Sequence, residues 1–281
     1  MIKITNLHYR YDSHAKPALK AIDLEIQEGT YVAVIGPNGC GKTTLIRHLN
    51  GLLVPTGGSI QVDGMDTGKS ADLRGIRQRV GMVFQNPDNQ IVGMSVQEDV
   101  SFGPGNLELP SGEIRKRVEH SLDLVGMTAF ADRAPHTLSG GEKQLVAIAG
   151  VLAMNPSYIV LDEPTSFLDP QARKRVLDVI RALNERGITI IHVTHNMNDI
   201  VDADRVIVMS EGRILMDEGP SRVFSKCEWL QELGLDVPVI TELLWRLNLM
   251  GLELPPDILK MDEACRALSS VIERGAAQNG S

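Results

Sequence analysis

Apolar runs that match β-strands alternate along the chain with segments that match helices. Residues 1–11 and 21–27 alternate apolar and polar side chains, which is typical of half-buried antiparallel strands. Residues 31–35, YVAVI, are wholly apolar and precede a glycine-containing turn, as expected of a parallel strand buried on both faces. The remaining strands are predicted at residues 57–64, 79–84, 158–163, 188–195, 205–210 and 213–219.

Helical segments separate these strands. In residues 111–126, apolar side chains recur at steps of three or four, as they do on one face of an amphipathic helix. Strands that alternate with helices predict an α/β fold with a parallel sheet, here preceded by antiparallel strands. The other helices of this part of the chain are predicted at residues 41–53, 140–155 and 170–187.

The strand pattern stops near residue 224, and two amphipathic helices follow, at residues 237–251 and 262–275. We therefore expect two units, a domain at residues 1–225 and a small helical appendage at residues 226–281. The apolar face of the first appended helix is formed by Ile240, Leu243, Leu244 and Leu247.

Composition narrows the class of protein. Of the 281 residues 43% are hydrophobic but only 4% are aromatic, so aliphatic side chains must fill the core. The net charge of −8 argues against a broad nucleic-acid-binding surface. No apolar run reaches the roughly 18–20 residues that span a bilayer, and the first residues do not resemble a secretion signal. The three cysteines lie far apart and predict neither disulfides nor a zinc site, so we expect a reduced, cytosolic chain.

The segment GPNGCGKTT, residues 36–44, lies between a predicted buried strand and a predicted helix. It fits the phosphate-binding pattern G-x-x-x-x-G-K-[ST], in which main-chain N–H groups and the helix N-terminus bind phosphate oxygens. Lys42 would reach the β- and γ-phosphates, and the Thr43 hydroxyl would bind Mg²⁺. The predicted nucleotide contacts are Gly36, Pro37, Asn38, Gly39, Cys40, Gly41, Lys42, Thr43 and Thr44.

Cys40 has two interpretations. A helix N-terminus lowers the pKa of a thiol, which would make this cysteine sensitive to oxidation or alkylation. The simpler interpretation, which we favour, is a small side chain that fits the loop.

Two acidic residues, Asp162 and Glu163, end the apolar strand YIVLDE. Beside a phosphate loop this pair predicts a Mg²⁺ ligand, Asp162, and a general base that activates water, Glu163. His195 ends another predicted strand, at the edge where α/β sheets bind ligands, and is expected near the γ-phosphate. His192 should point to the opposite face and is expected in the core.

The segment LSGGEKQ, residues 138–144, contains Ser139, Gly140 and Gly141 before a predicted helix and forms a second potential anion site. Together these motifs resemble those of the ATP-binding cassette (ABC) ATPases, over residues 1–225. In that family two subunits pack head to tail, and each ATP lies between the phosphate loop of one subunit and the LSGGEKQ-type signature of the other. The resemblance implies an ABC-type P-loop core with a helical signature subdomain. It also implies roles for Gln85 near Mg²⁺ and the attacking water, and for Asp169 in the loop Ser166–Asp169. The aromatic residue that stacks on adenine falls on Tyr11, with Tyr9, two residues away on the same strand face, as the alternative.

The segments FQNPDNQIV, residues 84–92, and FGPGNLELP, residues 102–110, resemble those of energy-coupling factor (ECF) transporter ATPases. These ATPases drive uptake of vitamins or of cobalt and nickel ions from the cytoplasmic face of the membrane. The resemblance implies that a membrane T-component contacts the Gln85–Val92 region, that an S-component is reached indirectly, and that the appendage helps to hold the two ATPases together. It places Gln90 on the surface that contacts the T-component.

Several positions depart from the family pattern, and alternatives remain. Glu142 stands where glutamine is usual, Leu145 where arginine is frequent, and Phe167 where a small residue is commoner. The rival functions are the ATPase of a conventional ABC importer and a non-transport ABC ATPase. The sequence leaves open which solute is transported and whether the ATPase pair is a homodimer or a heterodimer.

Overall fold

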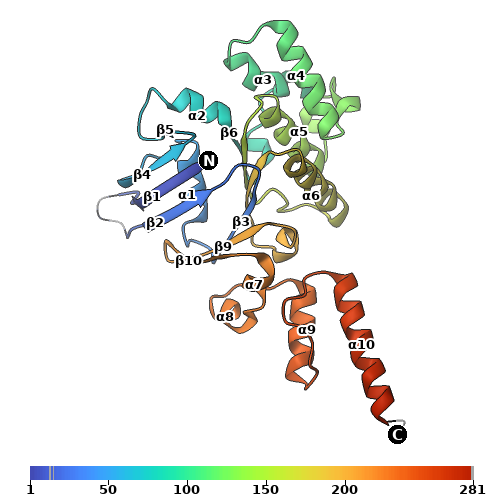
Figure 1. The fold of residues 1–281 in the computed structure, drawn as a ribbon. Coiled ribbons are helices and arrows are strands. Elements are labelled where there is room, and N and C mark those ends of the chain that lie inside the picture. The colour runs from blue at the N-terminus through green and yellow to red at the C-terminus, as the bar shows by residue number, and fades with distance from the viewer. Residues whose placement is uncertain (13, 15, 280–281) are drawn as a thin grey trace.

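The computed structural model describes residues 1–279 except 13 and 15, with side chains described to residue 271. Its centre is a six-stranded sheet in the order β10-β9-β3-β8-β7-β6 (Figure 1). Five strands are parallel and β10 is antiparallel, which confirms the predicted α/β class. The strands are β3 (Tyr31–Ile35), β6 (Val80–Val83), β7 (Tyr158–Asp162), β8 (Thr189–Val193), β9 (Arg205–Ser210) and β10 (Arg213–Glu218).

A second, antiparallel sheet lies beside the first and has the order β2-β1-β4-β5 (Figure 1). Its polar–apolar alternation arises because only one face is buried, against α1 and one face of the central sheet. This arrangement confirms the predicted antiparallel pairing of the first two strands. The elements are β1 (Ile2–Tyr9), β2 (Leu19–Ile26), α1 (Lys42–Leu49), β4 (Gly57–Val62), β5 (Met65–Asp66) and α2 (Leu73–Arg79).

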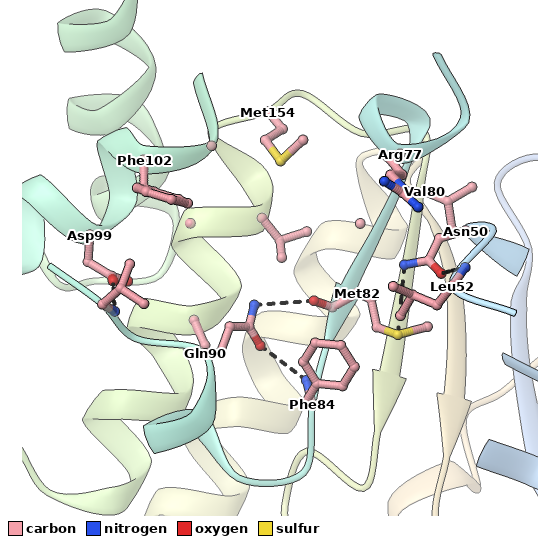
Figure 2. A pocket seen from close by; sticks show the side chains of 16 residues that line it. Asn50, Leu52, Arg77, Val80, Met82, Phe84, Gln90, Asp99, Phe102 and Met154 are labelled. Atoms are coloured by element: carbon pink, nitrogen blue, oxygen red, sulfur yellow. Dashed lines mark hydrogen bonds between the residues drawn. The ribbon is translucent and has the colours of Figure 1, made fainter. Parts of the chain in front are cut away.

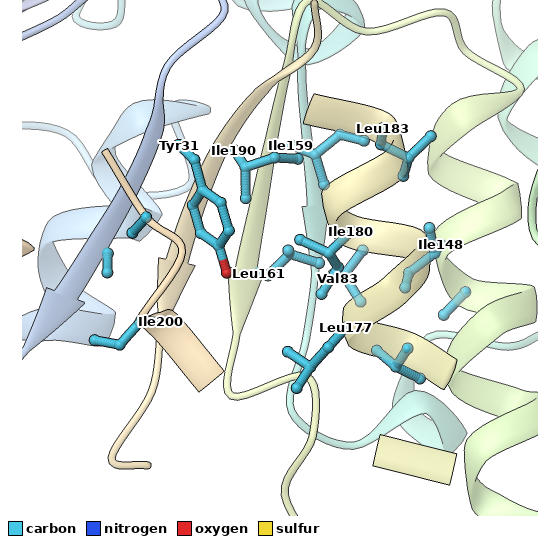
Figure 3. Packing of buried hydrophobic residues seen from close by; sticks show 14 of the residues in the cluster. Tyr31, Val83, Ile148, Ile159, Leu161, Leu177, Ile180, Leu183, Ile190 and Ile200 are labelled. Carbon is cyan, nitrogen blue, oxygen red and sulfur yellow. The ribbon is translucent and has the colours of Figure 1, made fainter. Parts of the chain in front are cut away.

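Helices cover the other face of the central sheet. Because side chains alternate along a strand, Ile159 and Leu161 of β7 face this helical layer while Tyr158 and Val160 face the opposite cluster. Figure 3 shows Leu177, Ile180 and Leu183 packed against the strands. The helices are α3 (Val96–Asn106), α4 (Ser111–Leu124), α5 (Gly140–Leu152) and α6 (Pro170–Glu185), with the 3₁₀ turns η1 (Pro87–Asn89), η2 (Thr128–Phe130), η3 (Pro135–Thr137) and η4 (Met197–Ile200).

The last helices form two groups. Residues of α7 (Pro220–Phe224) and α8 (Cys227–Glu232), with Leu235 and Val237, belong to the main core. A separate small cluster begins only with α9 (Val239–Leu249) and α10 (Met261–Asn279), which project away from the sheets (Figure 1). We therefore propose that the division lies near residue 238 rather than at the expected residue 226.

One residue of the predicted apolar face of α9 is placed differently. Leu244 is buried, but Leu243 is 44% exposed, because among the described residues α9 packs mainly against its neighbours α8 and α10. In the described part of the chain we find no helix with the length and apolarity needed to cross a membrane.

His192 lies in the core as predicted, fully buried, and shares a 2.8 Å hydrogen bond with the Tyr31 hydroxyl through Nδ1. Burial lowers the pKa of His192 to about 4. In the unfolded chain this histidine has a pKa of about 6.5, so between pH 6.5 and pH 4 the unfolded state binds a proton that the folded state does not. The free energy of unfolding should therefore fall by about 3 kcal/mol as the pH drops from 6.5 towards 4.

Urea denaturation between pH 7 and pH 4.5 tests this expectation. The His192→Phe variant should lose that part of the pH dependence, whereas the exposed control His136→Gln should retain it. Equal pH slopes in the wild type and His192→Phe would contradict the assignment.

Candidate functional site

The phosphate loop connects β3 to α1, and its backbone requires glycine. Gly41 has a φ of 110°, and a Cβ there would lie 2.7 Å from the Ala18 carbonyl oxygen. A Cβ at Gly36 would lie 2.3 Å from the Met209 carbonyl oxygen. No side chain caps the N-terminus of α1, so its first N–H groups remain free to bind an anion.

Lys42 is buried and folded back over this loop. Its ammonium group donates hydrogen bonds to the carbonyl oxygens of Gly36 at 2.6 Å and Pro37 at 3.1 Å. These contacts satisfy the charge inside the loop and hold the ammonium group where a phosphate could replace the carbonyl partners.

Cys40 is buried behind the loop, against Gly36. Burial raises the pKa of the Cys40 thiol, and the nearby Lys42 charge opposes this rise only in part. The expectation that the helix N-terminus would lower this pKa was therefore wrong, because desolvation of the thiolate is the larger effect. The structure favours the interpretation of Cys40 as a small residue that fits the loop.

Asp162, at the end of β7, lies beside the start of α1. The Thr43 hydroxyl donates a hydrogen bond of 3.4 Å to Asp162 Oδ1. Burial raises the pKa of the Asp162 carboxyl, and the negative charge of Glu163 adds to the rise. A hydroxyl and a buried carboxylate are hard oxygen ligands of the kind that Mg²⁺ takes together with substrate phosphates, so these residues fit a magnesium ion.

Three side chains converge on one oxygen of Glu163. Its Oε2 accepts hydrogen bonds of 2.9 Å from Gln85 Nε2 and from the Ser166 hydroxyl, and it lies 3.2 Å from His195 Nδ1. The structure thus brings together residues that are far apart in the sequence. Glu163 Oε1 has no hydrogen-bond partner among the described residues, so this oxygen is available to a reactant.

The two tyrosines near residue 10 lie differently. The Tyr9 ring is partly buried in the core and contacts the His48 ring edge-on. Tyr11 is 60% exposed, and its hydroxyl lies 2.9 Å from Thr44 Oγ1. Of the two rings, Tyr11 therefore offers the more accessible surface for stacking on a base.

The signature residues form a separate hollow. Ser139 caps α5 in a reciprocal arrangement with Glu142, and these hydrogen bonds to Ser139 lower the pKa of Glu142. A Cβ on Gly141 would lie 2.6 Å from that of Ala172, so glycine allows α5 to approach α6 closely. Gly140 begins α5, and Asp169, which caps α6, lines the same hollow as Ser139. The hollow shares no residue with the pocket around Glu163 and His195, which we call the catalytic pocket.

The catalytic pocket has a volume of about 460 Å³, and part of its wall was not expected from the sequence. Besides Pro37, Asn38, Gln85, Glu163 and His195, it is lined by Met197 and by Gly234, Leu235 and Asp236. Leu235 and Val237 are anchored in the main core, so the exposed Asp236 between them borders the pocket. In the sequence, the apolar–polar–apolar pattern of residues 235–237 could have indicated that Asp236 points away from the core.

An apolar groove of about 310 Å³ lies at the β6 edge of the central sheet, between this strand and the helices α3 and α5 (Figure 2). Phe102, which is 58% exposed, and Val92 lie along it. Gln90 also lines the groove, but its amide is turned inward: Nε2 donates to the Met82 carbonyl at 3.2 Å, and Oε1 accepts from the Phe84 N–H at 3.1 Å. The amide thus takes the place of a further strand at the edge of the sheet.

Known proteins resemble this chain over most of its length. Residues 19–166 match the ABC transporter family. The chain is 53% identical to the cobalt import ATP-binding protein CbiO of Syntrophus aciditrophicus, over 96% of each chain. It is 51% identical to the energy-coupling factor transporter ATP-binding protein EcfA1 of Caldanaerobacter subterraneus, over 94% of this chain and 96% of the relative.

Solved structures are similar as well. The structure of cbiO1 from Clostridium perfringens, described as part of the ABC transporter complex cbiONQ, has a TM-score of 0.76 and 38% identity. The superposition with cbiO1 covers 89% of this chain and 98% of the cbiO1 chain. The cassette MJ0796, dimeric and bound to ADP and phosphate in a post-hydrolysis state, has a TM-score of 0.69 and 33% identity, over 78% of this chain and 98% of its own.

The burial of two cysteines predicts their reactivity. Cys265 is exposed, whereas Cys40 and Cys227 are buried with raised pKa values. Iodoacetamide at pH 7.5 should modify Cys265 at least about tenfold faster than the other two, because the thiolate is the reactive form. Peptide mass spectrometry over time measures the rates, and the chain denatured in urea is the control, in which all three should react similarly. Rapid modification of Cys40 that bound ATP abolishes would instead support the redox-sensor interpretation.

Proposed function

Because the chain belongs to the ABC transporter family of ATP-binding proteins, we propose that it hydrolyses ATP to drive an ECF-type importer from the cytoplasmic face of a membrane. The observation that carries the proposal is the convergence of Gln85, Ser166 and His195 on Glu163 beside the phosphate loop. Similarity to CbiO and EcfA1 over nearly the whole chain supports the ECF type. The described residues after 224 form only helices and their connections, which disfavours a conventional importer with a β-rich regulatory domain.

ATP would bind with its phosphates on the loop at residues 36–44 and its adenine against Tyr11. Lys42 would exchange its two carbonyl partners for phosphate oxygens, which are stronger acceptors. Thr43, Asp162 and Gln85 would hold Mg²⁺, which supplies positive charge to the phosphate oxygens.

Glu163 would act as the general base. Its Oε2 is fixed by three neighbours, which leaves Oε1 to accept a proton from water as the water oxygen attacks the γ-phosphorus. The bond from that phosphorus to the bridging oxygen breaks, and ADP and inorganic phosphate result. His195 would leave Glu163 to contact the γ-phosphate and so report its presence.

The working unit would be a head-to-tail pair. The signature hollow and the catalytic pocket share no residue, so we propose that Ser139, Gly140 and Gly141 serve the nucleotide of a partner ATPase, with Asp169 beside them. Phe167, in the loop before Asp169, is 93% exposed with a φ of 65°, as suits a residue that a partner covers.

The appended helices would strengthen this pair. Three exposed apolar residues, Val239, Leu243 and Met250, lie along α9 and at its C-terminal end. Their spacings of four and seven residues place them on one face of the helix. A second ATPase subunit, identical or homologous, would bury this face.

The apolar groove would receive a helix of the membrane T-component, and the S-component would be reached through that protein. A groove lined by Phe102, Val92 and Met82 suits the apolar face of an amphipathic helix. For the solute we propose a transition-metal ion such as cobalt, which the name of the CbiO relative favours, with a vitamin as the alternative.

Substituting the proposed base tests the mechanism. Glu163→Gln should bind ATP but release phosphate at least about 100-fold more slowly, because the amide cannot accept the proton. Light scattering with ATP should show a closed dimer that accumulates. The exposed Glu232→Gln is the control and should behave as the wild type. Wild-type turnover in Glu163→Gln would show that another group is the base.

A charge in the groove tests the membrane partner. Phe102→Asp should sharply reduce co-purification of the transmembrane component from membranes, because the carboxylate would lose its hydration against an apolar helix. Nucleotide binding should remain, since Phe102 lies outside the catalytic pocket. Leu215→Asp, at an exposed apolar position on β10, is the matched control. Undiminished co-purification with Phe102→Asp would exclude the groove as the docking site.

A further inference from the structure

The short turn η1 is attached on two sides. On one side the Gln90 amide bonds to the edge of β6 (Figure 2). On the other side Asp88 Oδ1 accepts a hydrogen bond of 2.7 Å from Lys143 Nζ of α5. The turn therefore bridges the central sheet and the signature helix.

Local sequence fixes the backbone of the turn from which the Asp88 side chain extends. Asn86 caps the turn, its Oδ1 accepting from the Asp88 N–H at 3.0 Å, and Pro87 occupies the first position of the turn. With Gln90 closing the other end, η1 is held at both of its ends. The Asp88 carboxylate is thereby presented to α5.

Each end of this bridge reaches a different nucleotide site of the proposed dimer. Gln85, next to Asn86, donates to the catalytic Glu163 in the subunit's own pocket, at 2.9 Å. Lys143 lies four residues after Ser139, at the end of α5 that would face the nucleotide of the partner. The connection between the two sites therefore runs through residues 85–88, the Asp88–Lys143 ion pair and residues 139–143.

We propose that the Asp88–Lys143 ion pair couples the two ATP sites of the dimer, so that occupancy of a subunit's own pocket sets the position of the signature it presents to its partner. This inference rests on the proposed head-to-tail ATPase. When the γ-phosphate draws Gln85 away from Glu163, η1 moves with Gln85, and the ion pair transmits the displacement to α5. Asp88 and Lys143 are positioning residues, and neither touches the reacting atoms.

The size of the effect follows from the exposure of the pair. Asp88 is 63% exposed and Lys143 19%, so the pair is partly screened by water. Pairs of this kind change an equilibrium about two- to fivefold. Coupling of this size lies at the lower end of allosteric coupling, so the Hill coefficient of a two-site ATPase should rise only modestly above 1.

Charge reversal in the full-length chain tests the proposal. We expect Asp88→Lys and Lys143→Asp each to lower the Hill coefficient for ATP hydrolysis from above 1 towards 1, and to lower turnover about two- to fivefold. The affinity of the subunit's own pocket for a fluorescent ATP analogue, measured at protein concentrations too low for pairing, should stay unchanged, because neither residue lines that pocket. The double variant Asp88→Lys/Lys143→Asp should restore cooperativity. A pair that only stabilised the fold would change the urea midpoint of the single variants and leave their Hill coefficient unchanged.

A matched control is Lys3→Glu, which reverses one member of a surface pair of the same length, 2.7 Å from Glu25, in the antiparallel sheet. This variant should keep the wild-type Hill coefficient. A wild type that hydrolyses ATP without cooperativity, single variants that keep it, or a double variant that fails to regain it would overturn the coupling. A wild type that hydrolyses no ATP would overturn the proposed function itself.

Discussion

The contacts of the Glu163 carboxylate depend on the order of three strands. β7 lies between β6 and β8, and all three run parallel. Gln85 follows β6, Glu163 follows β7 and His195 follows β8, so two of the three groups that converge on Oε2 come from the neighbouring strands. The register pairs Asp162 with Val193 of β8, and the Glu163 N–H donates to the Val193 carbonyl at 2.9 Å. Any shift of this register would separate the carboxylate from its partners.

The same constraint explains why the inner strands of the central sheet are mainly apolar. A central strand with a helical layer on one face and a second sheet on the other has no face for polar side chains, so polar groups collect at the strand ends. Within β8, Thr189 lies at the start of the strand, whereas His192 is a polar residue of its interior, where Tyr31 on the adjacent strand satisfies its Nδ1. His195, three residues later, has left the strand and faces the pocket.

The fold and much of the site follow from local pattern. Strand periodicity and the glycine spacing of residues 36–44 are properties of a few neighbouring residues, so the central strands and the phosphate loop could be predicted. Features that depend on tertiary contacts could not. Burial of Cys40 reverses the direction of its pKa shift, the inward turn of Gln90 depends on the free edge of β6, and Asp236 reaches the pocket only because its neighbours are anchored in the main core.

Opposite charges lie together at the N-terminal end of α5, where Arg175 also lines the hollow. The helix N-terminus is partly positive, but the Glu142 carboxylate lies against Ser139 and offsets this charge. Lys143 follows directly, yet its charge is already paired with Asp88. A phosphate at this end would therefore meet main-chain N–H groups, the Arg175 guanidinium and, once it leaves Glu142, the Ser139 hydroxyl. The directions of the main-chain groups depend on how α5 is oriented. An ion pair that orients α5 consequently has more influence on such a site than a free lysine charge would have.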